Sequence, residues 1–460
     1  MTAARFYEER DRRTVEYLIG NSSPLMLPVS VHAGDDACLT KAGQMVLVTL
    51  ANQMARVHRN LHFALRSPEA RLLTNPLCRG RTLGEEIEQL CGRIDPFGSF
   101  TVGGPSLQSR SSVAVGVGLD VSANLNWYLG NERFIARLQR SRCPVGEDST
   151  GDLFGAGLAA VLGASAAFKN GMGVETVPTV LSAWNLNTGD DAAPGPSNVP
   201  ILNVGRGLMV GAGAVGSAVM YWLAHLGDVS DWTVVDADVV KLHNTNRCLL
   251  FFPDDAGWPD RIPRSKVSCI GTVRDDVTPV RQWYHEADAC ADIFDVNLIL
   301  ANDHHVRTLV SSRNDPIQLQ GTTGQSWLSQ LHRHIVGRDD CVRCRMDDIK
   351  DPALICGEVP LDVSDGPSET DAALPFLTAA AGLMVVSALL RLHVGEFGRR
   401  RVNTWRWDFR TTQAMTSFGT HRCHDGCSTK LPSSVRREIA QNTRWVGSRW
   451  LNSLGSAKPG

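Results

Sequence analysis

Three glycines, Gly211, Gly213 and Gly216, follow a short apolar run and precede a segment of helical apolar spacing that ends at Leu226. In the order strand, glycine turn, helix, such glycines are typical of nucleotide binding. We interpret Gly211 as allowing the tight turn, Gly213 as letting phosphate approach the backbone, and Gly216 as letting helix and strand pack closely. The N–H groups and positive dipole at the start of the helix favour an anion there.

Charged and amide side chains follow the next predicted strand. That strand ends at Asp236, about twenty residues after the glycines, where an acid can hydrogen-bond ribose hydroxyls. Asn244, Arg247 and Lys266 come next; Arg and Lys neutralise phosphate charge, and asparagine adds a neutral donor. A nicotinamide dehydrogenase needs no such cluster, whereas an enzyme that handles a triphosphate does.

The pattern Asp-x-Asp-x-Val-x-x-x-Asn-x-x-Arg, followed later by Ser-Lys, resembles the ThiF/MoeB and ubiquitin-activating (E1-like) superfamily. The resemblance implies ATP-dependent adenylation of the C-terminal carboxylate of a small ubiquitin-like protein. It assigns ribose binding to Asp236 and phosphate contacts to Asn244, Arg247 and Lys266, the last two also catalytic, and it adds Asp238 to the cofactor-binding set. The chain departs from the family pattern at His243 and Cys248, and in a longer, proline-rich segment before Lys266.

The run from Asp292 to Asp303 predicts a buried strand that ends in an acid. Ligands lie at the carboxyl ends of the strands in parallel α/β sheets, so Asp303 is expected to point at the nucleotide. It matches the acid of the superfamily's Asp-Asn motif, and the resemblance implies that this catalytic acid holds Mg²⁺. The alternative is a helix N-cap, and the two roles can coexist.

Two cysteine pairs, Cys341 with Cys344 and Cys423 with Cys427, suit tetrahedral zinc in a reducing compartment. The superfamily often carries two such pairs on either side of its late helix. The second pair has one extra residue between its cysteines, so either the spacing is relaxed or His424 replaces one cysteine. A redox-active pair is the alternative to structural Zn²⁺.

Cys356 lies between the first cysteine pair and the late helix, where the thioester-forming members of the superfamily carry their cysteine. A thiolate is the side chain best suited to trap an acyl adenylate. We therefore expect Cys356 to be the catalytic cysteine, with Cys248 as the second candidate.

The chain predicts an α/β fold with two Rossmann-like, adenylation-type halves, the first degenerate and the second active with a zinc-clamped C-terminal region. In the first half, residues 44–65 predict strand, turn and helix, and residues 112–138 predict a strand followed by a helix. An alanine-rich helix at 154–169 matches a late helix at 372–392 in the second half. The first half lacks the glycines and the Asp-x-Asp pattern, so we expect it to be inactive; an unrelated α/β domain is the alternative.

Residues 191–200, rich in proline, glycine and small residues, predict a linker with a boundary near residue 198. The expected domains are 1–198, degenerate and adenylation-like; 199–430, active and ThiF-type, with the catalytic-cysteine loop and zinc site; and 431–460, a C-terminal tail. Residues 4–20 predict a helix with Arg12 and Arg13 on a charged face. That face is either solvated or supplies an arginine to a nucleotide in the other half or another subunit.

The 460 residues carry a net charge of −2 and are 43% hydrophobic, which predicts a globular protein that binds neither nucleic acid nor membrane. Twelve cysteines without a secretory leader predict reduced thiols or metal ligands and a cytoplasmic location.

More narrowly, the two-half layout and the runs Cys-Gly-Glu-Val and Asp-Ala-Ala-Leu-Pro-Phe-Leu resemble the bacterial activating enzymes of Bil-type antiphage operons. The resemblance implies a ubiquitin-like partner and a separate conjugating enzyme, and it leaves a homodimer open. The alternatives are an adenylyltransferase for a sulfur-carrier protein of cofactor biosynthesis, and a non-catalytic scaffold that binds a ubiquitin-like partner.

Overall fold

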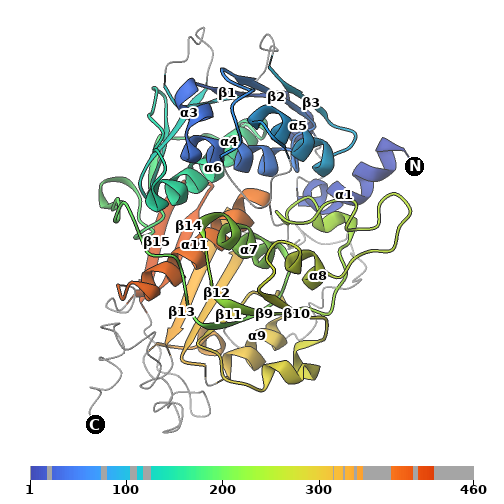
Figure 1. Cartoon of the computed structure of the whole chain (residues 1–460), viewed down its shortest axis with the longest axis vertical. Coiled ribbons are helices and arrows are strands. Elements are labelled where there is room, and N and C mark those ends of the chain that lie inside the picture. Colours follow the sequence, from blue (N-terminus) through green and yellow to red (C-terminus); the bar gives the residue numbers. More distant parts are fainter. Residues whose placement is uncertain are drawn as a thin grey trace.

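The structure is a computed structural model that describes residues 2–17, 23–73, 80–103, 111–117, 126–313, 315–324, 327–335, 339–345, 374–396 and 402–418. Figure 1 shows two α/β halves, one above the other, with the N-terminal helix α1 (Ala3–Tyr17) at the side where they meet.

The first half is built on a seven-stranded sheet in the order β3-β2-β1-β4-β5-β6-β7. Its strands are β1 (Val29–Ala33), β2 (Asn60–Leu65), β3 (Ser99–Val102), β4 (Ser111–Val115), β5 (Trp127–Glu132), β6 (Ile135–Gln139) and β7 (Thr179–Ser182). The strands from β3 to β5 pair in parallel, whereas β6 and β7 join antiparallel. Strand β1 therefore lies in the interior of the sheet, between β2 and β4, and each of its apolar side chains is buried.

The second half repeats this order with one more strand, as β10-β9-β8-β11-β12-β13-β14-β15. Its strands are β8 (Arg206–Val210), β9 (Asp231–Val235), β10 (Val277–Val280), β11 (Val296–Ile299), β12 (Ile317–Gly324), β13 (Leu328–Ile335), β14 (Val402–Asp408) and β15 (Gln413–Phe418). Both sheets change from parallel to antiparallel at the same place, between β5 and β6 and between β12 and β13. The predicted pair of Rossmann-like halves is thus confirmed.

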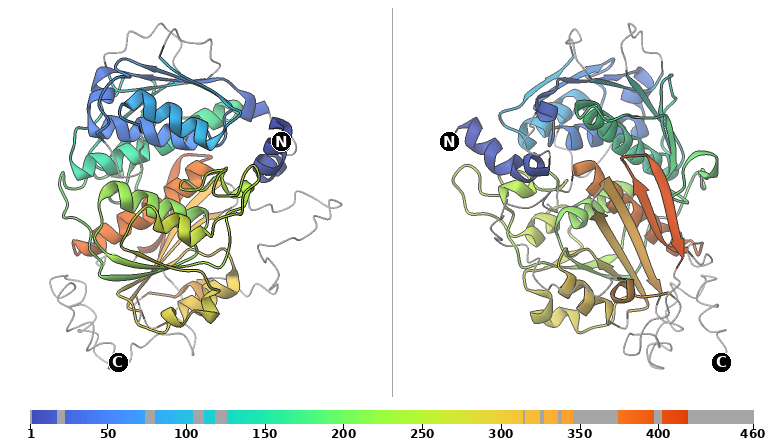
Figure 2. Two further views of the ribbon diagram at one scale, coloured as in Figure 1. Left: turned by 45° about the vertical axis from the view of Figure 1, so that its right-hand side comes forward. Right: turned by 180° about the vertical axis from the view of Figure 1, so that it is seen from behind.

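Four long helices fill the space between the two sheets (Figures 1 and 2). They are α4 (Lys41–Met54) and α6 (Thr150–Gly171) from the first half, and α7 (Ala214–Leu226) and α11 (Pro375–His393) from the second. Helix α6 packs on α11 across the boundary, with α4 and α7 beside them. Hydrogen bonds cross the same boundary: Thr49 with the Tyr221 hydroxyl at 2.9 Å, and Trp407 Nε1 donating to the Leu186 carbonyl at 3.0 Å.

The remaining helices are shorter. They are α2 (Ser23–Met26), α3 (Asp35–Leu39), α5 (Leu83–Ile94), α8 (Lys266–Gly271), α9 (His304–Ser311) and α10 (Val342–Arg345), with short 3₁₀ segments at Gly189–Asp191, Leu242–Asn244, Tyr284–Glu286 and Asp288–Cys290.

Helices α6 and α11 are long and apolar enough to cross a bilayer by length and composition alone. Their most apolar windows are 94% and 100% buried inside the protein, so in this fold both serve as core helices. A helix that is apolar on every side needs such complete burial, because it has no polar face to offer to water.

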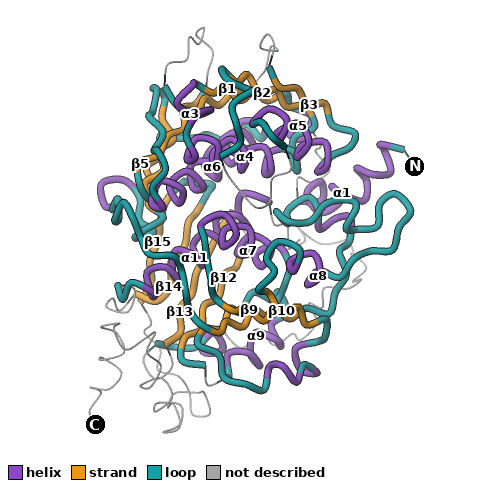
Figure 3. The backbone as a smooth tube through the Cα atoms, viewed as in Figure 1, coloured by secondary structure: helices purple, strands orange, loops and turns teal. Residues whose placement is uncertain are grey.

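Two of the element predictions for the first half are wrong. Residues 44–65 form most of helix α4 and then strand β2 (Figure 3), the reverse of the predicted order. The reason is that burial of α4 on every side removes the amphipathic period that marks most helices. After β4 the described residues 127–139 form strands β5 and β6 rather than a helix. The predicted late helices are confirmed as α6 and α11.

Candidate functional site

The candidate site lies where strands β8 and β11 meet. The chain leaves β8 for helix α7 and returns to β9 on one side, whereas β11 pairs with β8 on the other side. This reversal of strand order is the position at which open α/β sheets bind ligands, beyond the carboxyl ends of the strands. The glycine turn, the end of β9 and the end of β11 therefore share one edge of the second sheet.

The geometry of the turn explains why each of the three positions is a glycine. Gly211 adopts a φ of +103°, and a Cβ built on it would lie 2.5 Å from the backbone nitrogen of Ala301. A Cβ on Gly216 would lie 2.2 Å from the Gly211 carbonyl oxygen, so α7 can begin this close to the turn only without a side chain there. Gly213, the N-cap of α7, faces open space, because a Cβ there would meet nothing within 4 Å.

Asp236 is fixed directly beneath this turn. Its carboxylate accepts hydrogen bonds from the backbone nitrogens of Ala212, at 2.8 Å, and of Asp238, at 2.9 Å. The turn and Asp236 therefore form one unit. The remaining lone pairs of the carboxylate stay available to accept hydrogen bonds from the two hydroxyls of a ribose. Burial raises the pKa of Asp236, although Lys266 and the two N–H groups work in the opposite direction.

Lys266, the first residue of α8, joins the same group. Its ammonium lies 2.7 Å from Asp238 Oδ2 and 4.0 Å from Asp236 Oδ1. Burial disfavours the ammonium, yet the two carboxylates outweigh burial and raise the pKa of Lys266, so it stays a cation at neutral pH. The structure thus brings three predicted cofactor-binding residues together at the carboxyl end of β9.

The segment after β9 carries Asn244 and Arg247, which are both buried. Arg247 Nη1 donates to the His243 carbonyl at 2.7 Å and to Asn246 Oδ1 at 3.0 Å, while Asn244 Oδ1 accepts from the Lys241 nitrogen. Their side chains are therefore positioned by the local backbone. Two further elements hold this segment: Asn246 Nδ2 donates to Thr14 Oγ1 of α1, and Thr378 of α11 donates to the Arg247 carbonyl.

Asp303 follows β11 and is the N-cap of α9, accepting a hydrogen bond from the Val306 nitrogen at 3.0 Å. Asp303 therefore caps the helix, as the alternative predicted. This hydrogen bond uses one carboxylate oxygen and leaves the second for a metal; binding of Mg²⁺ by Asp303 stays a prediction.

The cysteine predictions fall largely outside the described residues. Cys356, Cys423, Cys427 and His424 all lie there. Cys341 immediately precedes α10 and Cys344 lies within it, where the Cys344 nitrogen donates to the Cys341 carbonyl at 3.1 Å. Among the described residues, no group of three or more metal-binding side chains is present.

Cys248, the second candidate for the thiol, is almost fully buried, and burial raises its pKa. A buried, protonated thiol is a poor nucleophile.

Helix α1 lies against the segment that carries Asn244, and its arginines differ in what they contact. Arg10 is buried in ion pairs with Asp11, at 2.7 Å, and with Asp95, at 2.9 Å, so it is committed to the first half. Arg12 is exposed, whereas the side chain of Arg13 lies outside the described part of the chain, so the role of this charged face stays a prediction.

At the corresponding junction of the first half, the chain supplies its own negative charge. Strands β1 and β4 occupy the places of β8 and β11. Helix α3 follows β1, and Asp36 on α3 accepts a hydrogen bond from the Val117 nitrogen, just beyond β4, at 2.8 Å. Its carboxylate also lies against Gly116, where a Cβ would come within 2.5 Å of Oδ1. A phosphate at this junction would meet a carboxylate. Sequence reasoning did not identify Asp36.

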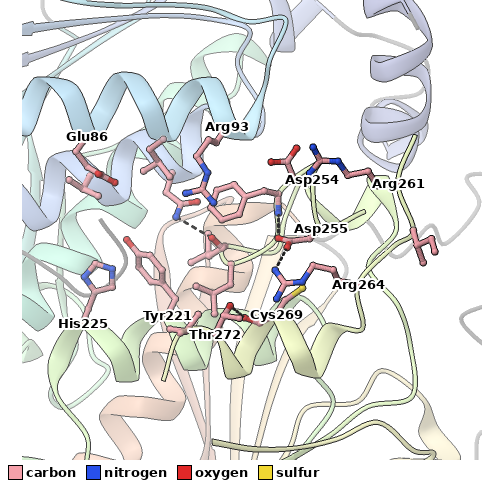
Figure 4. Close-up of a pocket in the computed structure, with 18 residues that line it drawn as sticks. Glu86, Arg93, Tyr221, His225, Asp254, Asp255, Arg261, Arg264, Cys269 and Thr272 are labelled. Carbon is pink, nitrogen blue, oxygen red and sulfur yellow. Dashed lines mark hydrogen bonds and ion pairs between the residues drawn. The ribbon is translucent and has the colours of Figure 1, made fainter. Parts of the chain in front are cut away.

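A cavity of about 410 Å³ opens between the halves. Figure 4 shows Glu86 and Arg93 of α5 on one side, with Tyr221 and His225 of α7 on the other. None of the three glycines of the turn is among the described residues that line this cavity, and neither is Asp236 or Arg247. It is therefore separate from the candidate nucleotide site.

Comparison with known proteins adds a family. The ThiF family model matches residues 198–429, half of the 460-residue chain. A search of curated proteins gives no match. Among solved structures, E. coli MccB with ATP is similar at 13% identity and a TM-score of 0.36, covering 49% of this chain and 65% of MccB.

E. coli MccB with AMPCPP and MccA shows 12% identity and a TM-score of 0.36, covering 49% of this chain and 66% of MccB. This chain thus spans just under two thirds of that protein. Identities and TM-scores this low do not indicate which substrate this chain uses. The family model, by contrast, covers half of the chain and includes the glycine turn and both acids, and on that ground the chain belongs to the ThiF family.

Proposed function

We propose that the second half adenylates the C-terminal carboxylate of a ubiquitin-like protein with ATP. One observation carries this proposal: the glycine turn, Asp236 and Lys266 form a single group at the β8–β11 junction, with Asn244 and Arg247 on the adjoining segment. ThiF family membership supports the same chemistry.

In this reaction a carboxylate oxygen of the partner attacks the α-phosphorus of ATP, and the bond to the β-phosphate oxygen breaks to release pyrophosphate. Gly213 leaves room for the phosphates against the start of α7, and Asp236 accepts the ribose hydroxyls. Arg247 and Lys266 offset the charge that gathers on the phosphates, and Asn244 donates a neutral hydrogen bond.

Asp303 would hold Mg²⁺, which spreads the negative charge of the phosphates when bound. The donor set fits, because magnesium in such sites takes one or two protein carboxylates together with phosphate oxygens and water.

In the second stage of the proposal, the Cys356 thiolate attacks the carbonyl of the adenylate and displaces AMP. The resulting thioester passes to a separate conjugating enzyme, in a cytoplasmic, antiphage system of the Bil type. Zn²⁺ on Cys341, Cys344, Cys423 and Cys427 would hold the surrounding chain. The domain boundary near residue 198 and the pairing of two chains into a homodimer belong to the same proposal.

The test is ATP–pyrophosphate exchange with purified full-length protein and a ubiquitin-like protein as the substrate. Exchange together with a thiol-sensitive conjugate on a non-reducing gel, lost in Cys356→Ala, is the expected result. Exchange without any conjugate would move the assignment to a sulfur-carrier adenylyltransferase. A protein that binds the partner but no nucleotide would be a scaffold, and adenylation would be refuted.

A further inference from the structure

Arg56, just beyond the end of α4 in the first half, reaches across to the second half. It is 1% exposed. Its Nη2 donates to the Leu249 carbonyl at 2.9 Å, and its Nη1 donates to the carbonyls of Phe251, at 3.0 Å, and Thr245. Its Nε donates to Asn52 Oδ1 at 2.9 Å, and Asn52 in turn donates to the Leu249 carbonyl at 3.2 Å. One guanidinium therefore gathers three backbone carbonyls of another domain.

Arg56 is a buried cation whose partners are neutral. In the described part of the chain no carboxylate lies within ion-pair distance of Arg56, whereas Arg10, equally buried, has two. Burying a cation costs several kcal/mol unless partners offset the lost hydration. A neutral amide would have satisfied one or two carbonyls at less cost, whereas the planar fork of an arginine reaches three at once.

The segment that Arg56 holds is the one that carries the candidate phosphate-binding side chains. Residues 245–251 continue directly from Asn244 and include Arg247. Arg247 takes its position from the His243 carbonyl and Asn246, so any shift of this backbone shifts the guanidinium. Thr14 and Thr378 hold the same segment from two other elements, but each makes one hydrogen bond to it, whereas Arg56 makes three.

We propose that Arg56 is a positioning residue for the nucleotide site, which makes the first half a structural part of that site. Arg56 acts through the backbone of residues 245–251 to fix Asn244 and Arg247 against the phosphates. This inference rests on the proposed function.

The experiment compares Arg56→Met with Lys169→Met in the full-length protein. Lys169 of α6 is the matched control, because it is also a buried cation of the first half that donates across the boundary to backbone, namely to the Arg410 carbonyl at 3.1 Å. Both variants lose a charge-assisted contact between the halves, but Lys169 is bonded to the turn after β14 rather than to the phosphate segment.

The Michaelis constant for ATP in pyrophosphate exchange is measured well below the melting temperature of each variant, so that loss of stability alone leaves it unchanged. We expect Arg56→Met to raise it about tenfold or more, the effect of misplacing a charge-assisted contact worth at least ~1.4 kcal/mol. Arg56→Lys should recover part of this loss, and Lys169→Met should stay within about twofold of wild type.

A double-variant cycle tests whether Arg56 acts on the nucleotide site through Arg247. If Arg56 acts through Arg247, then Arg56→Met should add little to the defect of Arg247→Met. Additive defects would overturn the proposal, as would an unchanged constant in Arg56→Met or an equal rise in Lys169→Met. If Arg56→Met does not fold, Arg56→Lys takes its place, and a wild-type constant in that variant overturns the proposal. Absence of exchange and of ATP binding in the wild-type protein would instead refute the proposed function.

Discussion

Asp303 has two roles open to it, and asparagine separates them. Asparagine caps a helix as well as aspartate does, so Asp303→Asn should keep the bond to the Val306 nitrogen and melt within a few degrees of wild type. The variant loses the negative charge that Mg²⁺ requires. We expect pyrophosphate exchange to fall by about 100-fold or more, as for other groups that stabilise transition-state charge. Exchange at the wild-type rate in the folded variant would leave Asp303 as a cap only.

The residues at strand ends were predictable from sequence, and Arg56 was not. Asp236 and Asp303 end runs of apolar residues, and parallel strands bring such ends to one edge of a sheet. Arg56 acts on a segment almost two hundred residues away, and nothing in the local pattern announces such a contact. The available signal was weak: Asn52 and Arg56 stand four residues apart, at and just beyond the end of α4.

At the scale of the element, the turn into α7 can be tested with two glycines that differ in what surrounds them. Gly213→Ala places a methyl group in open space at a φ of −78°, so stability should be unchanged while nucleotide affinity falls, because the methyl group occupies the approach of the phosphates. Gly216→Ala forces a methyl group against the Gly211 carbonyl and should cost about 1–3 kcal/mol of stability.

Thermal melting and nucleotide titration of both variants check this prediction. Normal ATP binding by a stable Gly213→Ala protein would show that phosphates do not approach the backbone there.

Helix α4 is followed by His58, a fully buried histidine that should make the fold sensitive to acid. Burial lowers the pKa of His58 to about 4. The unfolded chain therefore takes up this proton first as the pH falls below the ordinary value of about 6.5, so stability is lost between about pH 6.5 and 4. At pH 5 the loss is about 2 kcal/mol at most.

His58→Met removes the titrating ring, so its melting temperature should fall less than that of wild type between pH 7.5 and 5. His285, whose side chain is 59% exposed, gives the control: His285→Gln should fall as far as wild type does. Equal acid sensitivity in all three proteins would contradict the prediction.

The sequence of residues 44–65 predicted a strand before a helix, whereas the structure has the helix α4 before the strand β2. The run Met45–Leu50 is rich in valine and leucine and carries no polar face, so its period distinguishes helix from strand poorly. The packing of α4 against α6 and α7 decides the matter, and that information lies in distant parts of the chain. Helices α6 and α11 were predicted from an alanine-rich run and from the resemblance of both segments to the late helix of the superfamily.

For the whole molecule, the repeated strand order predicts two nucleotide sites, whereas the residues predict one. Calorimetric titration of the full-length protein with ATP and magnesium should give one nucleotide per chain. A variant with Asp236→Ala should bind none, because the remaining junction carries Asp36 in place of a glycine turn. As a control, Asp231→Asn at the exposed start of the same strand should leave affinity unchanged. Two nucleotides per wild-type chain would mean that the first half is also active.

The carboxylate of Asp36 can also be viewed as a tethered competitor. A free anion reaches a binding site in proportion to its concentration, but a side chain joined to the site by a few bonds is present at an effective concentration far above that of any cellular nucleotide. Removing that carboxylate would not recreate a glycine turn, since α3 would still fill the junction. We therefore expect the first half to stay closed to nucleotide, which would leave its helices and Arg56 to serve the other half.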